Sequence, residues 1–175
     1  MFRKILVAIE RSKLGQQVFD EALTLAKSLS ASMILLNVLS PEDEASPSTP
    51  MLSSYECYPS GISRSVGEIY QELWQNYAER ELEMLKLLAD QAKEAGVDAK
   101  LCQRFGSPSR IICELARELN ADLIVLGRRG ISGLNELILG SVSNYVLHHA
   151  TCSVLTIHRQ RQNLVDTAEK QIAIV

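Results

Sequence analysis

Short runs of apolar, often branched residues that alternate with helix-like segments most limit what this chain can fold into. Such runs occur within residues 3–9, 32–39 and 121–127, and they are typical of strands buried on both faces of a sheet. Between the first two, apolar residues recur every three or four positions from Leu14 to Leu29, the spacing of an amphipathic helix. The alternation predicts a parallel sheet with helices on both faces.

The same patterns assign the rest of the chain. Strands are also expected at 97–105, where apolar and polar residues alternate, and at 152–158. Further helices are expected at 66–95, 108–119 and about 142–149, with Ser12 and Ser107 as N-caps and Gly96 as a stop signal. Residues 40–65 hold four prolines among serines and acidic residues, and they are expected to form a long mobile surface loop.

Length and charge narrow the class of protein. The 175 residues suffice for one domain with a substantial core. The net charge of −3 argues against a nucleic-acid-binding surface, which is normally basic. Apolar runs are too short to span a membrane, and the N-terminus does not resemble a secretory signal. These features predict a cytoplasmic protein without a nucleic-acid or membrane partner.

A glycine-containing connection points to the chemistry. Gly127-Arg128-Arg129-Gly130 directly follows an apolar run, and Gly140-Ser141-Val142-Ser143 opens the next helix-like segment. Glycines let backbone N–H groups approach an anion closely, and a helix start adds unpaired N–H groups and the positive end of its dipole. The pattern therefore predicts a phosphate site, although such glycines can also serve merely to make a tight turn. Neither the P-loop spacing nor the dinucleotide fingerprint is present.

The spacing Gly-x2-Gly-x9-Gly-Ser resembles the ATP-binding branch of the universal stress protein family. Segments 4–10, 121–127 and 149–157 resemble strands of that family, so the resemblance covers about residues 2–158. It implies an α/β fold with a five-stranded parallel sheet in the order 3-2-1-4-5, of the adenine nucleotide alpha hydrolase-like type. We expect one domain over 1–158 and a C-terminal tail of uncertain structure over 159–175.

The strand order implied by the resemblance places a binding site at the carboxyl ends of the strands, where the winding direction reverses. The family implies an adenine nucleotide there, ATP or AMP, with or without Mg²⁺. We expect phosphate and ribose contacts from the glycine connection, an adenine slot from apolar residues, and a ribose or magnesium contact from one carboxylate. The candidate residues are Ala8, Glu10, Val38, Leu126, Gly127, Arg129, Gly130, Gly140, Ser141, Val142 and Ser143.

Several of these residues have a second interpretation. Ala8, Val38 and Leu126 are equally well explained as core. Glu10-Arg11-Ser12 stands where the family usually has Asp-Gly-Ser, so Glu10 either contacts ribose or metal or is a loop carboxylate paired with Arg11. Arg128 and Arg129 either contact phosphate or are solvated charge.

The leading functional hypothesis is a regulatory stress-response protein that senses an adenine nucleotide. The alternatives are a slow ATPase or nucleotidyl- or phosphoryl-transfer enzyme, and an interaction scaffold with an empty site. We name no catalytic residue. The family commonly forms homodimers through the last strand, and segment 153–157 here has the apolar, branched composition of an edge strand that needs covering. A homodimer through that strand is expected.

Overall fold

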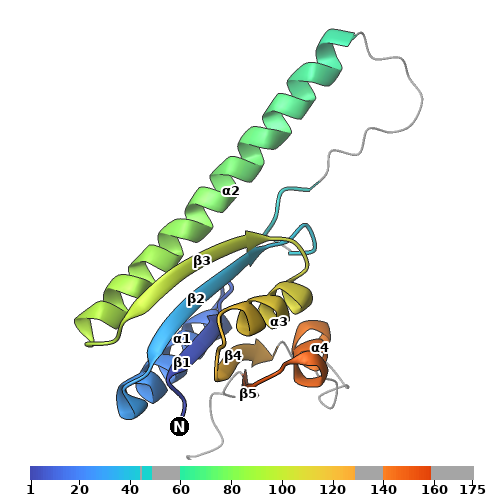
Figure 1. Cartoon of the computed structure of the whole chain (residues 1–175). Coiled ribbons are helices and arrows are strands. Elements are labelled where there is room, and N and C mark those ends of the chain that lie inside the picture. The colour runs from blue at the N-terminus through green and yellow to red at the C-terminus, as the bar shows by residue number, and fades with distance from the viewer. Residues whose placement is uncertain (44, 49–59, 129–139, 159–175) are drawn as a thin grey trace, which may run out of the picture.

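The computed structural model describes residues 1–43, 45–48, 60–128 and 140–158 of the chain (Figure 1). Its strands are β1 (Lys4–Ala8), β2 (Ser32–Leu39), β3 (Ala99–Phe105), β4 (Leu123–Arg128) and β5 (Ser153–His158). Its helices are α1 (Lys13–Leu29), α2 (Ser60–Glu94), α3 (Pro108–Glu118) and α4 (Ser141–His149). Each expected element is present, with ends that mostly differ by one or two residues.

The strands form one parallel sheet in the order β3-β2-β1-β4-β5, which confirms the predicted strand order. β1 lies at the centre, with β2 on one side and β4 on the other. In register, Ala8 at the end of β1 lies between Leu36 on β2 and Leu126 on β4. The chain runs from β1 to β2 and β3 on one side of the sheet and then crosses to β4 and β5 on the other side. The winding direction therefore reverses between β1 and β4, and ligands of such sheets bind at the carboxyl ends of the strands at this point.

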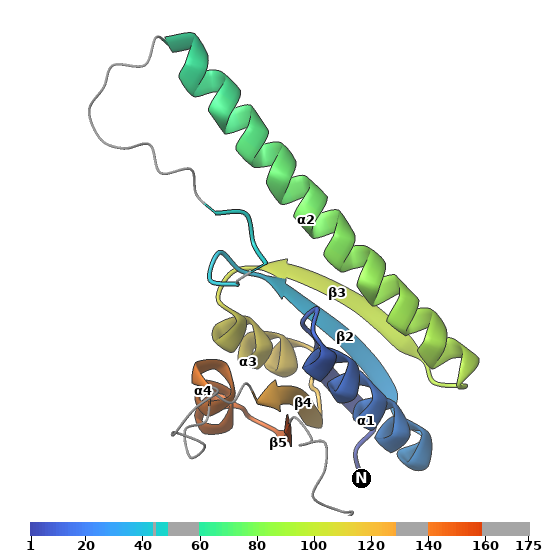
Figure 2. The ribbon, with the colours of Figure 1, turned by 180° about the vertical axis from the view of Figure 1, so that it is seen from behind.

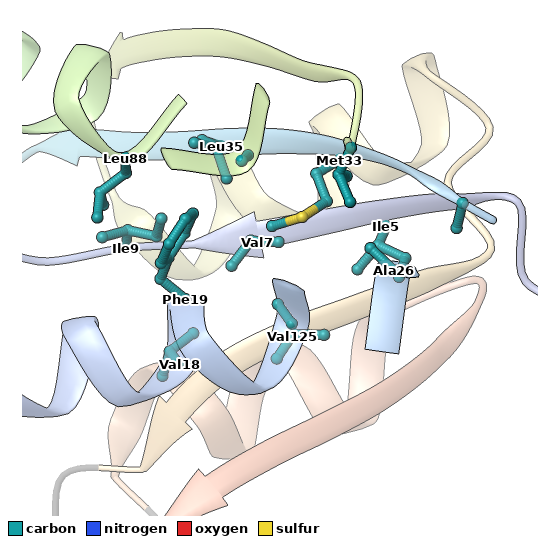
Figure 3. Close-up of a cluster of buried hydrophobic side chains, with 14 of the residues drawn as sticks. Ile5, Val7, Ile9, Val18, Phe19, Ala26, Met33, Leu35, Leu88 and Val125 are labelled. Carbon is teal, nitrogen blue, oxygen red and sulfur yellow. The ribbon is translucent and has the colours of Figure 1, made fainter. Parts of the chain in front are cut away.

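Each face of the sheet carries its own core because successive strand residues point to opposite faces. Ile5, Val7 and Ile9 pack with α1 and α2, in the cluster drawn in Figure 3. Leu6, on the same strand, packs with α3 and α4 on the other face. Near-continuous burial of β1, β2 and β4 accounts for their nearly unbroken apolar sequences.

Helix α2 differs from its prediction and extends beyond the sheet. It begins at Ser60, six residues before the expected start, so the final part of the predicted loop 40–65 is helical. Residues 49–59 of that loop and the tail 159–175 lie outside the described part of the chain. The 35 residues of α2 span about 52 Å at 1.5 Å each, and Figures 1 and 2 show its N-terminal half projecting past the strands.

Local signals explain where the helices begin. The Ser12 hydroxyl caps α1 by accepting a hydrogen bond from the Gly15 N–H at 3.0 Å. Ser107 precedes α3 as expected but makes no side-chain cap, and Pro108 instead presets the first helical turn. Among the described residues, no helix has both the length and the hydropathy of a membrane span.

Candidate functional site

A pocket of about 240 Å³ opens at the carboxyl ends of β1, β2 and β4, where the winding direction of the sheet reverses. The loop after β1, the segment after β2, the first turns of α1 and α3 and the start of α4 complete its walls. Nine of the eleven candidate residues line it: Ala8, Glu10, Val38, Leu126, Gly127, Gly140, Ser141, Val142 and Ser143. The other two, Arg129 and Gly130, lie outside the described residues. Topology thus brings distant segments of the chain to one cavity.

The N-terminus of α4 presents backbone N–H groups at this pocket. The first intrahelical bond runs from the Asn144 N–H to the Gly140 carbonyl at 2.9 Å, so the N–H groups of residues 141–143 precede the helical ladder. Ser143, 2% exposed, donates its hydroxyl to the same carbonyl at 3.0 Å. The N-cap residue of α4 is Gly140, so no side chain caps this helix. Attraction for an anion here comes first from the main chain and the helix dipole.

Gly127 has a packing role that the sequence did not predict. A Cβ at this position would lie 2.9 Å from the Leu14 side chain and 3.3 Å from Val18, both on α1. The missing side chain therefore allows close packing of β4 against α1. Gly127 lines the pocket, but the crowding that a side chain here would cause is with α1, at the contact between helix and sheet.

Glu10 is held at the pocket rim by its own loop. The Ser12 hydroxyl donates to Glu10 Oε1 at 2.9 Å, and the Ser12 N–H donates to the Glu10 carbonyl at 2.9 Å. Arg11 turns towards α2, where its Nε lies 2.9 Å from Glu81 Oε1. Arg11 thus forms an ion pair with a carboxylate on α2, a partner that the sequence did not predict.

The apolar candidates belong to the core and also border the pocket. Leu126 is buried in the core on the α3–α4 face, and Ala8 and Val38 are partly buried beside it. All three also border the cavity. Arg128 projects to β5, where its Nη1 lies 3.4 Å from His158 Nε2.

Sequence reasoning missed the polar residues on the β2 side of the pocket. Asn37, Ser40, Glu42 and Asp43 all line it. Asn37 was detectable as an amide inside an otherwise apolar strand, and it is only 4% exposed. Glu42 and Asp43 follow the strand within a segment expected to be a mobile loop, so nothing in the sequence placed them at a cavity.

The polar groups under this rim have altered acidity. Burial raises the pKa of the Glu81 carboxyl, and the neighbouring Arg11 opposes that shift. The Tyr77 hydroxyl donates to Asp43 Oδ2 at 3.2 Å. Burial, followed by the negative charge of Asp43, raises the pKa of this phenol above its usual range. Both side chains are therefore held on α2 in a poorly hydrated environment.

The residues suit a magnesium ion carried by phosphates better than an ion held by the protein. Among the described residues, no group of three or more His, Cys, Asp or Glu side chains forms a metal cluster. Glu10 is a carboxylate at the pocket rim, and Mg²⁺ commonly uses one or two carboxylates together with phosphate oxygens and water. Glu10 therefore fits the part of a single, water-mediated ligand.

The chain forms a five-stranded, doubly wound α/β sheet with a pocket at its switch point, and its structural neighbours are adenine nucleotide alpha hydrolase-like folds. The model of the universal stress protein family matches residues 1–158, and the chain belongs to this family. It is 35% identical over 156 residues to universal stress protein Sll1388 of Synechocystis, covering 89% of this chain and 97% of the relative. It is 36% identical over 157 residues to YxiE of Bacillus subtilis, covering 90% and 99%.

Solved structures share the fold at lower identity. Hypothetical protein MJ0577 superposes with a TM-score of 0.69 at 22% identity, covering 93% of this chain and 99% of that one. A universal stress protein in complex with cAMP gives 0.58 at 23% identity, covering 90% and 97%. An Arabidopsis thaliana family protein with AMP bound, At3g01520, gives 0.57 at 20% identity, covering 90% and 92%.

Proposed function

We propose that the pocket binds an adenine nucleotide, ATP or AMP, and that the protein acts as a nucleotide-dependent regulator in the stress response. The observation that carries this proposal is the cavity at the switch point, bordered by the N-terminus of α4 on one side and the end of β2 on the other. Related structures hold cAMP and AMP, which supports an adenine nucleotide over other anions.

Charge sets the orientation of the ligand. Phosphates belong at α4, because its leading N–H groups and dipole favour negative charge. The β2 side carries Glu42 and Asp43, whose carboxylates repel phosphate and accept hydrogen bonds from donors such as the amino group of adenine. Glu10 lies between these two ends, at the close of β1, where a ribose would be expected.

The cavity suits a nucleoside with its first phosphate. Its volume of about 240 Å³ lies just below the roughly 300–1,000 Å³ of sites that enclose drug-sized ligands. Further phosphates would extend past Gly140 and Ser141, where Mg²⁺ would be held by the phosphates with Glu10 nearby. Several charge-assisted hydrogen bonds of about 1.5–3 kcal/mol each support affinities near micromolar, about −8 kcal/mol after association costs.

Calorimetric titration of the protein with AMP, ATP and cAMP, with and without Mg²⁺, tests the proposal. Gly140→Val places a branched side chain at the anion end. Gly140 has φ −57° and ψ 151°, a conformation open to any residue, so the variant should fold and lose at least tenfold in affinity. Gly67→Val is the matched control, since a Cβ added there meets nothing within 4 Å. Absence of binding by the unchanged protein, or full affinity in Gly140→Val, contradicts the proposal.

The same samples decide between a sensor and an enzyme. Phosphate release is measured alongside the heat of binding. Binding without turnover is expected, because efficient hydrolysis needs a placed base and charge stabilisation at the γ-phosphate. Steady release that is abolished by Glu10→Gln would instead favour the slow ATPase.

We also propose that the protein forms a homodimer through β5. This strand lies at the sheet edge beside β4, and Leu155 on it is 38% exposed. An uncovered edge is a template for pairing, and a second copy would extend the sheet. Light scattering should give twice the mass of the chain, whereas a monomer mass contradicts the proposal.

A nucleotide sensor of this kind would work in the cytoplasm, which cell fractionation can check.

A further inference from the structure

A buried carboxylate on α2 lies beneath the pocket rim without being part of the pocket wall. Glu81 is 3% exposed and follows Tyr77 by four residues on α2, the helix that packs against β2 and β3 (Figure 2). Its two oxygens reach different parts of the chain. Oε1 lies 2.9 Å from Arg11 Nε, and Oε2 accepts a hydrogen bond from Asn37 Nδ2 at 3.3 Å.

Both partners of Glu81 are tied to the segment that carries Glu10. Arg11 is the next residue along the chain, and its Nη2 also donates to the Arg80 carbonyl on α2. Asn37 Nδ2 donates in addition to the Ile9 carbonyl at 3.2 Å, and Ile9 is the residue before Glu10. One carboxylate thus connects, through two partners, to the residues on either side of Glu10.

A second amide side chain helps to fix the orientation of Asn37. Gln103 Nε2, on β3, donates to Asn37 Oδ1 at 3.5 Å and to the Ala78 carbonyl of α2 at 3.0 Å. The network therefore joins β3, β2, the loop after β1 and α2. Because Ile9, Glu10 and Asn37 line the pocket, its shape on this side depends on where α2 holds these residues.

We propose that Glu81 is a positioning residue for the nucleotide site, holding Glu10 and Asn37 in place through Arg11 and its own hydrogen bond to Asn37. This inference rests on the proposed function and extends it by making α2 part of the site. Burial of an ion pair is weak evidence for stability, because the cost of desolvation offsets much of the attraction. A fully connected buried network does specify one arrangement of its members.

The variants Glu81→Gln and Arg11→Met test the proposal. Glu81→Gln keeps the shape of the side chain and removes its charge, and Arg11 is half exposed, so its guanidinium can be solvated. We expect AMP affinity to fall roughly three- to tenfold in either variant, the value of about one hydrogen bond, at a nearly unchanged urea midpoint. Glu79→Gln and Glu83→Gln remove the same charge at exposed positions of α2 and should leave affinity unchanged.

Coupling between the two residues is the sharper readout. In the double variant the two losses should not add, because each single change breaks the same connection. Arg11→Lys, which keeps the charge and part of the reach, should recover some of the affinity lost in Arg11→Met. Additive losses, or equal affinities for Glu81→Gln and Glu79→Gln, would overturn the proposal.

A measurement without nucleotide separates this proposal from the proposed function. In the free protein the Ser12 N–H bonds to the Glu10 carbonyl, and its exchange with solvent reports on the order of the loop. Exchange at Ser12 should accelerate several-fold in Glu81→Gln and not in Glu83→Gln, while amides of α3 stay unchanged. Unaltered Ser12 exchange overturns the positioning role, whereas failure of the unchanged protein to bind any nucleotide overturns only the proposed function.

Discussion

A Cβ on Gly15 would collide with the carbonyl oxygen of Glu10. The first turn of α1 therefore packs directly on the backbone of the loop that follows β1. This contact explains why a glycine occupies a buried position in a helix, where it is usually unfavourable. It also makes Gly15 a determinant of where Glu10 lies at the pocket rim.

Gly15→Ala should destabilise the protein by about 1–3 kcal/mol, since the added methyl meets backbone that must shift as a unit. Displacement of Glu10 should also weaken nucleotide binding. Urea unfolding and calorimetric titration measure the two effects. Gly67→Ala, in an open position of α2, is the control and should stabilise by about 0.5–1 kcal/mol. Equal stability of the two variants would contradict the contact.

Gly127→Ala should cost about 1–3 kcal/mol through crowding against Leu14. Leu14→Ala alone should also destabilise, because it removes a buried side chain. In the double variant the methyl at 127 has space, so the combined cost should be smaller than the sum of the two. Urea unfolding of the four proteins gives this coupling directly, and strict additivity would show that the two positions do not interact.

Stability at acid pH should depend on Asp122. Its carboxylate accepts hydrogen bonds from the Arg3 and Lys4 N–H groups at 2.8 and 2.9 Å, and these bonds lower the pKa of Asp122 below 3.8. A lowered pKa in the folded state contributes stability that is present above 3.8 and is lost as pH falls through the folded value. The unfolding midpoint of Asp122→Asn should lie below that of the unchanged protein at pH 7, and the gap should narrow below pH 4. A gap that is constant with pH contradicts the assignment, and Asp90→Asn on the exposed face of α2 serves as control.

The contribution of Glu81 to stability should change with pH in the direction opposite to that of Asp122. Its pKa is raised by burial above 4.5, so the folded protein takes up a proton at higher pH than the unfolded chain does. Stability attributable to this group therefore increases as pH falls from the raised value towards 4.5. The unfolding midpoint of the unchanged protein should therefore rise relative to that of Glu81→Gln as pH falls through that window. A difference that shrinks with acidification would contradict the raised pKa.

Fold and pocket were predictable from the sequence to different degrees. Apolar runs, the alternation in β3 and helical spacing sufficed to predict each strand and helix that the structure describes, because strands and amphipathic helices have distinct periods. Nine candidate residues could be assigned to one pocket before the structure was known, because the family resemblance implied the strand order. The start of α2 at Ser60 was missed, since serine and glycine around the first turn resemble a loop. Glu42 and Asp43 were missed because their place depends on how the chain leaves β2. Nucleotide binding by these residues stays a prediction.

Local composition and spacing specify most of the secondary structure, the buried strands and the glycine-bearing connection to α4. The roles of the individual side chains follow instead from tertiary contacts. Gly127 makes room for Leu14, Arg11 pairs with Glu81, and Ser143 bonds to the Gly140 carbonyl. The Arg11 and Gly127 contacts join residues distant in the chain, and chain spacing alone does not specify which distant groups come within bonding distance.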